Sequence, residues 1–186
     1  MSQSTNNAAA GTSEKTFSAY NKDQGKVYAQ IRRKYHPSVY QSILDHHTSI
    51  GGQLDTLLDV GCGPGIATQG LAPRFAHAIG LDPSEGMIAT ARSLGGVTAS
   101  SETIRYEVST AEELGLDLSP PIQDDSIDLI IAANAAHWFD IERFWPRAAR
   151  VLKPGGNVAL WTSGEVRAHP SMPNAAAIQT VMDQNF

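Results

Sequence analysis

The segment 54–66 constrains the fold most, because a dense apolar run leads directly into closely spaced glycines. The apolar residues of 54–60 lack strict alternation, which is typical of a strand covered by helices on both faces of a parallel sheet. Gly61, Gly63 and Gly65 let the backbone turn sharply and pass close to a ligand, where a Cβ would obstruct the approach. The segment therefore predicts an α/β fold with a nucleotide-binding turn at the end of a buried strand.

The spacing of these glycines is G-x-G-x-G, which departs from the dinucleotide-binding pattern G-x-G-x-x-G. Ile66 stands where that pattern has its third glycine, and Asp59 puts a carboxylate where a dinucleotide would bring phosphate. A ligand that carries a positive charge and no phosphate fits the turn better. A nicotinamide-dependent oxidoreductase is therefore the disfavoured alternative.

The segment 58–65, Leu-Asp-Val-Gly-Cys-Gly-Pro-Gly, resembles the first motif of class I S-adenosylmethionine-dependent methyltransferases. The resemblance implies a Rossmann-like parallel sheet and S-adenosyl-L-methionine as the cofactor, whose methionine part the glycine loop supports. On this resemblance, Asp59, Gly61, Cys62 and Gly63 are candidate cofactor-binding residues. A nucleophilic role for Cys62 is the weaker alternative to a small buried turn residue, because no base lies near it in the sequence.

A second acidic residue ends the next predicted strand, about 20 residues beyond the glycines. From this position a carboxylate takes the ribose hydroxyls of an adenosine, which makes Asp82 the strongest single candidate. The alternative is that Asp82 caps the following helix, although Ser84 can serve as the cap instead. The segment 80–87 also resembles the family's second motif, so Pro83 and Met87 are candidates near the adenine, with a core position as the alternative for Met87.

Two further loops complete the candidate cofactor site. In the family, the loop after the third strand holds the adenine amino group, which makes Ala111 and Glu112 the matching candidates, although many relatives carry Asp earlier in that loop. The fourth predicted strand, 126–133, is continuous and apolar like the first. Asn134 and Ala135 follow it and open at the same edge as the glycine loop if the strands are parallel.

His137 and Trp138 come next, and such a pair after the fourth strand is frequent in small-molecule methyltransferases. His137 is the catalytic candidate, because a histidine can exchange a proton near neutral pH. The equally weighted alternative is that His137 lines the pocket wall or binds a backbone carbonyl. The adjacent His46 and His47 do not predict a metal site, since neighbours on a helix point about 100° apart.

The chain is predicted to have three parts. Residues 1–16 hold almost nothing to bury and predict a disordered tail, whereas 17–52 show apolar residues at helical spacing and predict an N-terminal helical cap that includes the cofactor candidate Tyr28. Residues 53–186 predict the Rossmann-like core, with Pro146 expected to kink or split a helix. The predicted strands are 54–60, 77–82, 103–108, 126–133 and 157–162, and the predicted core helices are 66–72, 84–94, 139–152 and 174–184.

Composition restricts the partners and the compartment. The formal net charge of the 186 residues is −5 and the basic run 32–34 is short, so nucleic acid is not an expected partner. No apolar run approaches the roughly 20 residues that span a bilayer, and the polar start of the chain lacks a signal-peptide pattern. With its one cysteine, the sequence predicts a soluble cytoplasmic protein without an internal disulfide.

The complete family fold has further strands and a substrate lid, so the resemblance implies a chain that lacks the last strands. A truncated, non-catalytic cofactor-binding module that acts with a partner is therefore an alternative to an enzyme. The N-terminal helices, His137-Trp138 and the segment 161–163 resemble the trans-aconitate methyltransferase group, which implies a small-molecule acceptor with a carboxylate or hydroxyl. The uncharged segment 157–162 would be left as a sheet edge, which predicts self-association.

Overall fold

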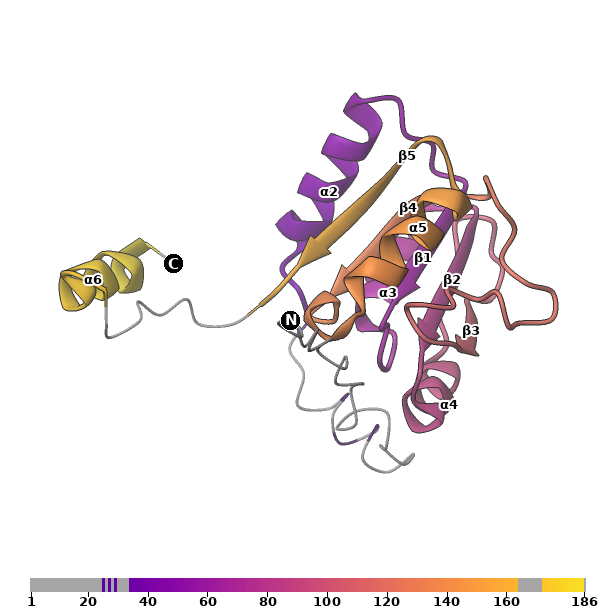
Figure 1. Ribbon diagram of the computed structural model, residues 1–186, viewed down its shortest axis with the longest axis horizontal. Coiled ribbons are helices and arrows are strands. Elements are labelled where there is room, and N and C mark those ends of the chain that lie inside the picture. The colour runs from indigo at the N-terminus through magenta and orange to yellow at the C-terminus, as the bar shows by residue number, and fades with distance from the viewer. Residues whose placement is uncertain (1–24, 26, 28, 30–33, 164–171, 186) are drawn as a thin grey trace, which may run out of the picture.

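The computed structural model describes residues 34–163 and 172–185, together with residues 25, 27 and 29. Its centre is a five-stranded sheet in the order β3-β2-β1-β4-β5, in which every neighbouring pair is parallel (Figure 1). This architecture confirms the predicted Rossmann-like α/β fold. The strands are β1 (Thr56–Val60), β2 (His77–Asp82), β3 (Arg105–Val108), β4 (Ile127–Ala133) and β5 (Leu152–Trp161).

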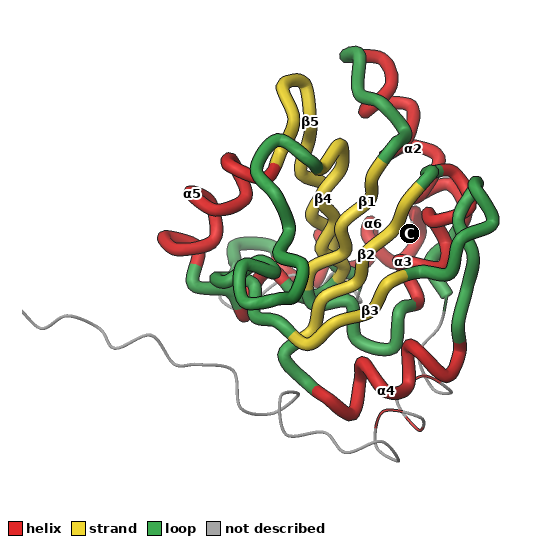
Figure 2. Tube along the Cα trace, turned by 90° about the vertical axis from the view of Figure 1, so that its right-hand side faces the viewer, coloured by secondary structure: helices red, strands yellow, loops and turns green. Residues whose placement is uncertain are grey.

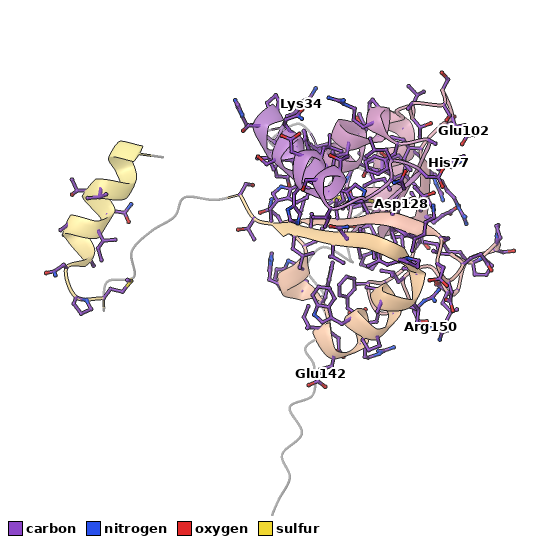
Figure 3. All side chains as sticks on the ribbon, turned by 90° about the horizontal axis from the view of Figure 1, so that it is seen from above. Lys34, His77, Glu102, Asp128, Glu142 and Arg150 are labelled. Atoms are coloured by element: carbon purple, nitrogen blue, oxygen red, sulfur yellow. The ribbon has the colours of Figure 1, made fainter. Side chains whose placement is uncertain are left out.

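Helices cover both faces of the sheet (Figure 2). One face packs against α2 and the helices that follow β1 and β2, and the other packs against α5. Seen from above in Figure 3, α2 and α5 lie on opposite sides of β5. The helices are α2 (Pro37–Ser49), α3 (Ile66–Leu71), α4 (Glu85–Leu94), α5 (Ile141–Val151) and α6 (Ala175–Asn185), with short 3-10 turns η1 (Ala72–Arg74) and η2 (Ala136–Trp138).

Both faces of the central strands are buried because consecutive residues belong to different cores. Leu57 packs with Leu71 of α3 on one face, whereas Leu58 packs with Phe144 of α5 on the other, and all four are fully buried. Because neither face reaches water, the strand has no reason to alternate apolar and polar residues. Burial on both faces of the sheet therefore explains why apolar residues follow one another in β1.

Several boundaries differ from the prediction. The turn 153–156 does not precede β5 but lies inside it as a bulge, because Ile127 pairs with Leu152 while Leu129 pairs with Asn157. Strands β1 and β3 begin two residues later than predicted, at Thr56 and Arg105. These shifts concern the amino ends of strands, where pairing with a neighbour decides the boundary.

The predicted split at Pro146 is wrong, since α5 is a single helix from Ile141 to Val151. Proline removes the hydrogen bond to the carbonyl four residues earlier, here that of Glu142 in the first turn of the helix. Pro146 is exposed, so its ring adds no clash with the core. Helix α5 also starts later than predicted, because the carboxylate of Asp140 accepts a hydrogen bond from the backbone N–H of Arg143, at 3.4 Å, and caps it.

The predicted tail 1–16 and Tyr28 lie outside the described residues, as does most of the first predicted helix. Within the part of the chain that the structure describes, no helix is long and apolar enough to cross a bilayer.

Candidate cofactor site

The three glycines that follow β1 all adopt left-handed backbone conformations. The φ angles are +67° at Gly61, +53° at Gly63 and +83° at Gly65, a region that residues with a Cβ rarely enter. The backbone N–H of Cys62 donates to the carbonyl of Leu81, at 2.9 Å, and so ties the loop to β2. The sequence pattern is thus a compact turn at the carboxyl edge of the sheet.

Close packing fixes two of these glycines and leaves the third open. A Cβ on Gly61 would lie 2.5 Å from the Cβ of Ala135, and one on Gly65 would overlap the hydroxyl of Tyr106. A Cβ on Gly63, in contrast, has no atom of the described residues within 4 Å. Gly63 is therefore the point of the loop where a ligand can approach the backbone from outside.

Asp82 joins the end of β2 to this loop. Its Oδ2 accepts a hydrogen bond from the N–H of Gly63 at 2.8 Å, and its Oδ1 accepts one from the N–H of Ser84 at 2.9 Å. The hydroxyl of Ser84 in turn accepts from the N–H of Met87, at 3.3 Å, so that Ser84 is the cap of α4. The alternative that Asp82 caps this helix is therefore wrong.

Asp59 lies beneath the glycine loop and is fully buried. Its Oδ2 accepts a hydrogen bond from the hydroxyl of Thr68 at 2.6 Å, whereas its Oδ1 has no partner. Burial, together with the nearby Asp82, raises the pKa of Asp59 to about 7. A carboxyl group in this setting resists ionisation unless a positive charge is brought close to it.

Cys62 does not have the surroundings of a nucleophile. Its side chain is 7% exposed, and burial, with Asp59 and Asp82 nearby, raises the pKa of its thiol. A protonated thiol is a poor nucleophile and a poor metal ligand. Cys62 instead packs in the core between β1 and α3, which agrees with the reading as a small buried turn residue.

The ends of β4 and β5 are fastened to each other by Asn134. Its amide nitrogen donates to the hydroxyls of Tyr35, at 2.8 Å, and Ser163, at 2.9 Å, while its Oδ1 accepts from the N–H of Ser163. Asn134 has a φ of +55°, a conformation that asparagine tolerates better than most residues. The neighbouring Ala135 is buried against Gly61. Both predicted residues thus lie beside the glycine loop.

The other adenine-side candidates are spread over two environments. Met87 is 2% exposed within α4, which favours its core alternative, while Pro83 before it is exposed. Ala111 is buried on the α5 face of the sheet. The carboxylate of Glu112 accepts a hydrogen bond from the N–H of Asp140 at 2.9 Å, so it joins the loop after β3 to the start of α5.

His137 lies in the 3-10 turn η2 just beyond Ala135, on the carboxyl side of β4, and is exposed. Its ring centroid is 4.9 Å from that of Trp138, which is itself 45% exposed. An exposed imidazole next to an exposed indole is open to an acceptor molecule. The turn therefore places His137 near the rim of the site rather than in its floor.

Three polar residues near the loop are not among the residues predicted from the sequence. Thr68 of α3 and Tyr106 of β3 lie near the buried Asp59, and Tyr35 binds Asn134. A hydroxyl-bearing residue two to three positions into the helix after the glycines was the available signal for Thr68.

The two neighbouring histidines of α2 point in different directions. His47 is buried and its Nε2 is 2.8 Å from the carbonyl of Gln53, whereas His46 is exposed. Across the described part of the chain, no three His, Cys, Asp or Glu side chains gather in an arrangement that could hold a metal ion.

The family model named "Methyltransferase domain" matches residues 58–160, which is more than half of the chain. The chain belongs to the methyltransferase family. This domain covers the glycine loop, Asp82 and the turn that carries His137. S-adenosyl-L-methionine is the cofactor of the family, and the observed lining of glycines and carboxylates fits a cationic ligand without phosphate.

Relatives of this methyltransferase agree in family and differ in length. A Dictyostelium discoideum protein assigned as a methyltransferase is 34% identical over 139 residues, covering 75% of this chain and 47% of that protein. One from Saccharomyces cerevisiae, assigned as S-adenosylmethionine-dependent, is 31% identical over 134 residues, covering 72% and 43%. The chain therefore spans less than half the length of these curated relatives. None of them is named for the trans-aconitate group, so that finer resemblance stays a prediction.

Solved structures give the same fold. A structure described as a type II methyltransferase from Anaeromyxobacter dehalogenans is 29% identical, with a TM-score of 0.58, and the match covers 84% of this chain and 57% of that one. A phosphoethanolamine N-methyltransferase of Haemonchus contortus, solved with S-adenosyl-L-methionine, has a TM-score of 0.59 at 22% identity and covers 89% and 38%. The second likeness concerns the fold alone.

Proposed function

We propose that this methyltransferase binds S-adenosyl-L-methionine at the carboxyl edge of its sheet and transfers a methyl group to a carboxylate or hydroxyl of a small metabolite. One observation carries the proposal: Asp59, the next-to-last residue of β1, and Asp82, the last residue of β2, are buried carboxylates near three glycines with positive φ. Acidic groups at this edge repel the pyrophosphate of a dinucleotide and accept a cation.

We assign each candidate residue to a part of the cofactor according to its position in the fold. Asp82 takes the ribose hydroxyls from its position at the end of β2, and Gly63 lets the methionine part approach the backbone. The buried Ala135 and the fastened Asn134 form the wall between the loop and β5. We further assign Cys62, Gly61, Pro83, Met87, Ala111 and Glu112 to the surroundings of the cofactor, with Met87 supporting it from the core.

S-adenosyl-L-methionine supplies a methyl group on a positively charged sulfur that is already a good leaving group. The chain's own contribution is therefore mostly to hold the acceptor in line with the methyl group and to exclude water. A carboxylate acceptor needs no base. A hydroxyl acceptor loses its proton as it is methylated, and His137 is placed at the rim to take that proton.

The binding half of the proposal is tested by calorimetry with S-adenosylhomocysteine and NADH. We expect micromolar or tighter binding of the first and none of the second. Binding of NADH alone would instead support the oxidoreductase alternative. The catalytic half is tested by following transfer of a labelled methyl group to a panel of small carboxylates and alcohols. Cofactor binding without transfer to any acceptor would favour the non-catalytic module.

The role of His137 is tested by His137→Ala, with His77→Ala as the control. His77 is an exposed histidine at the other end of the sheet, paired with Glu102. If His137 takes a proton, its loss lowers kcat by about 10² or more for a hydroxyl acceptor while cofactor affinity stays unchanged. Weaker cofactor binding with normal turnover at saturation would move His137 to the cofactor.

We also propose that the molecule self-associates through β5. This strand pairs with β4 alone among the described strands, is only half-buried, and has Leu160 41% exposed. An unpaired apolar edge favours pairing with another strand. Light scattering should show a dimer or larger species at tens of micromolar, and Leu160→Lys should reduce it, whereas Leu116→Lys in a loop should not. A monomer at all concentrations would contradict this.

Two assignments from the sequence complete the proposal. We propose a cytoplasmic location for this domain, in keeping with a single reduced cysteine. We propose that residues 17–52 act as a helical cap on the core 53–186. The structure describes α2 of this cap, and Leu44 of α2 packs on the same face of the sheet as α3 and α4.

A further inference from the structure

Asp59 has one oxygen for which the fold provides no hydrogen-bond donor. The residue is 0% exposed, and its Oδ2 is occupied by Thr68 at 2.6 Å, but its Oδ1 is unpaired. A buried charged acceptor without a partner is costly, and native proteins keep few of them. Asp59 is the next-to-last residue of β1, two positions before Gly61, so this buried oxygen belongs to the strand end that carries the proposed cofactor site.

The groups that face Asp59 do not offset a negative charge. The titratable ones are Asp82 from β2, Cys62 from the glycine loop, Tyr106 from β3 and Tyr40 from α2. All four are acids or neutral at physiological pH, and burial raises the pKa of Tyr106 to above its ordinary range and that of Tyr40 to about 12. Among the described residues, no lysine, arginine or histidine compensates Asp59. Among these groups the fold thus supplies Asp59 with no positive charge.

We infer that Asp59 selects the positively charged cofactor by exchanging a proton: its carboxyl group is neutral in the cofactor-free protein and becomes a carboxylate when the cation is bound. The inference rests on the proposed cofactor site. The proton of the neutral form is on Oδ1, because Oδ2 accepts from the hydroxyl of Thr68. On binding, the O–H bond breaks, its electron pair stays on Oδ1 and the proton leaves to solvent.

Burial favours a protonated Asp59 in the cofactor-free protein, as the inference requires. It raises the pKa of Asp59 from 3.8 to about 7, so below neutral pH the folded protein holds a proton that the unfolded chain does not. Stability therefore falls as pH rises from about 4 to 7, and above 7 this contribution is flat. A bound cation favours the carboxylate and lowers the pKa again.

The proton exchange also makes the affinity for the cofactor differ from the affinity for the product. S-adenosylhomocysteine lacks the sulfonium charge, so it compensates the carboxylate less and leaves more of the proton in place. Asp59 then favours the charged cofactor over its neutral-sulfur product, and more so at higher pH. This gives the buried acid a role in specificity that is separate from the ribose contact assigned to Asp82.

The test is titration calorimetry of the whole chain in pairs of buffers with different ionisation enthalpies, which counts protons released on binding. Asp59→Asn is the matched variant, since it keeps the shape and removes the titration. At pH 6 the wild type should release about one proton more per S-adenosyl-L-methionine than the variant, and at pH 8.5 about none. Wild-type affinity should rise about tenfold from pH 6 to pH 8, whereas that of Asp59→Asn should stay flat.

Infrared difference spectra of the wild type give a second measurement that does not depend on the variant folding. At pH 6, adding the cofactor should remove one protonated-carboxyl band and add a carboxylate band, and S-adenosylhomocysteine should do so to a smaller extent. Tight binding without a difference in proton release, or without the band change, overturns the inference and leaves the proposed function standing. No binding of the cofactor at any pH overturns the proposed function itself.

Discussion

Asp128 and Asp59 are buried carboxylates in adjacent central strands, near the amino end of β4 and the carboxyl end of β1. Asp128 is 3% exposed, and its Oδ2 accepts from the ammonium of Lys153 and from the N–H of Thr56, each at 2.8 Å. Asp59 is 0% exposed, accepts a hydrogen bond from the hydroxyl of Thr68, and has no cation beside it among the described residues. Figure 3 shows Asp128 on the side of the molecule where His77 begins β2.

The difference shows how one sheet serves two purposes. At the amino end, Lys153 bridges Asp128 and Asp55, and the pKa of Lys153 is raised by hydrogen bonds to both carboxylates. This compensates the buried charge within the chain and contributes to stability. At the carboxyl end, no cation of the described residues pairs with Asp59, and we propose that the bound cofactor supplies the positive charge. On this proposal, a buried acid without a cation distinguishes the binding edge of the sheet from the structural edge.

The largest expected effect comes from placing a side chain in the glycine loop. Gly63→Val should abolish cofactor binding, because its Cβ would stand in the open space where the ligand approaches the backbone. Gly155→Val is the matched control at the other end, since Gly155 also has positive φ, +83°, and nothing within 4 Å. Each variant costs about 1–2 kcal/mol of backbone strain. Calorimetry with intact affinity in a folded Gly63→Val would reduce the loop to a connector.

Asp82→Ala should have the next largest effect. Charged hydrogen bonds of this kind contribute roughly 1.5–3 kcal/mol, so affinity for S-adenosylhomocysteine should fall about tenfold or more. Asp55→Ala removes a carboxylate at the opposite end of the sheet, where the side chain is 52% exposed, and should leave the affinity unchanged. Equal affinities of Asp82→Ala and the wild type would remove Asp82 from the site and weaken the comparison of the two ends.

The smallest effect is on stability alone. Lys153→Met leaves Asp128 buried without its cation, and we expect the free energy of unfolding to fall by about 1–2 kcal/mol, less than for a fully buried pair because Lys153 is about a third exposed. Arg143→Met breaks an exposed pair with Glu113 and should cost under about 0.5 kcal/mol. Denaturant unfolding measures both, and cofactor affinity should not change in either variant.

The pH dependence of stability also differs in sign between the acids at the two ends of the sheet. The pKa of Asp55 is lowered, mainly by the hydrogen bond from Lys153, so the stability from this pair is present above about pH 4 and is lost as pH falls through the folded value. Lys153→Met should therefore weaken the protein at pH 7 more than at pH 3. Asp59 acts in the opposite direction, because its raised pKa makes stability fall as pH rises toward 7.

The site was predicted where its signals are local in sequence. The glycine turn, Asp82 at the end of β2 and Ser84 as a cap are short patterns whose geometry follows from a few neighbouring residues. The contact between Asn134 and Tyr35 was not predicted, because these residues are 99 positions apart and no local pattern relates them. The bulge within β5 was missed for the same reason, since its register is set by β4.

The sequence by itself determined the family, the order of strands, turns and helices, and the positions of the acids. Each of these follows from the spacing of apolar residues, glycines and carboxylates along the chain. Only the tertiary structure decided which acid is compensated. Asp128 meets Lys153 because β4 and β5 pair side by side, whereas packing closes over Asp59 and brings Asp82 and Thr68 to it. Burial and the distances between charges are properties of the packed molecule, and they set the free energy of a carboxylate.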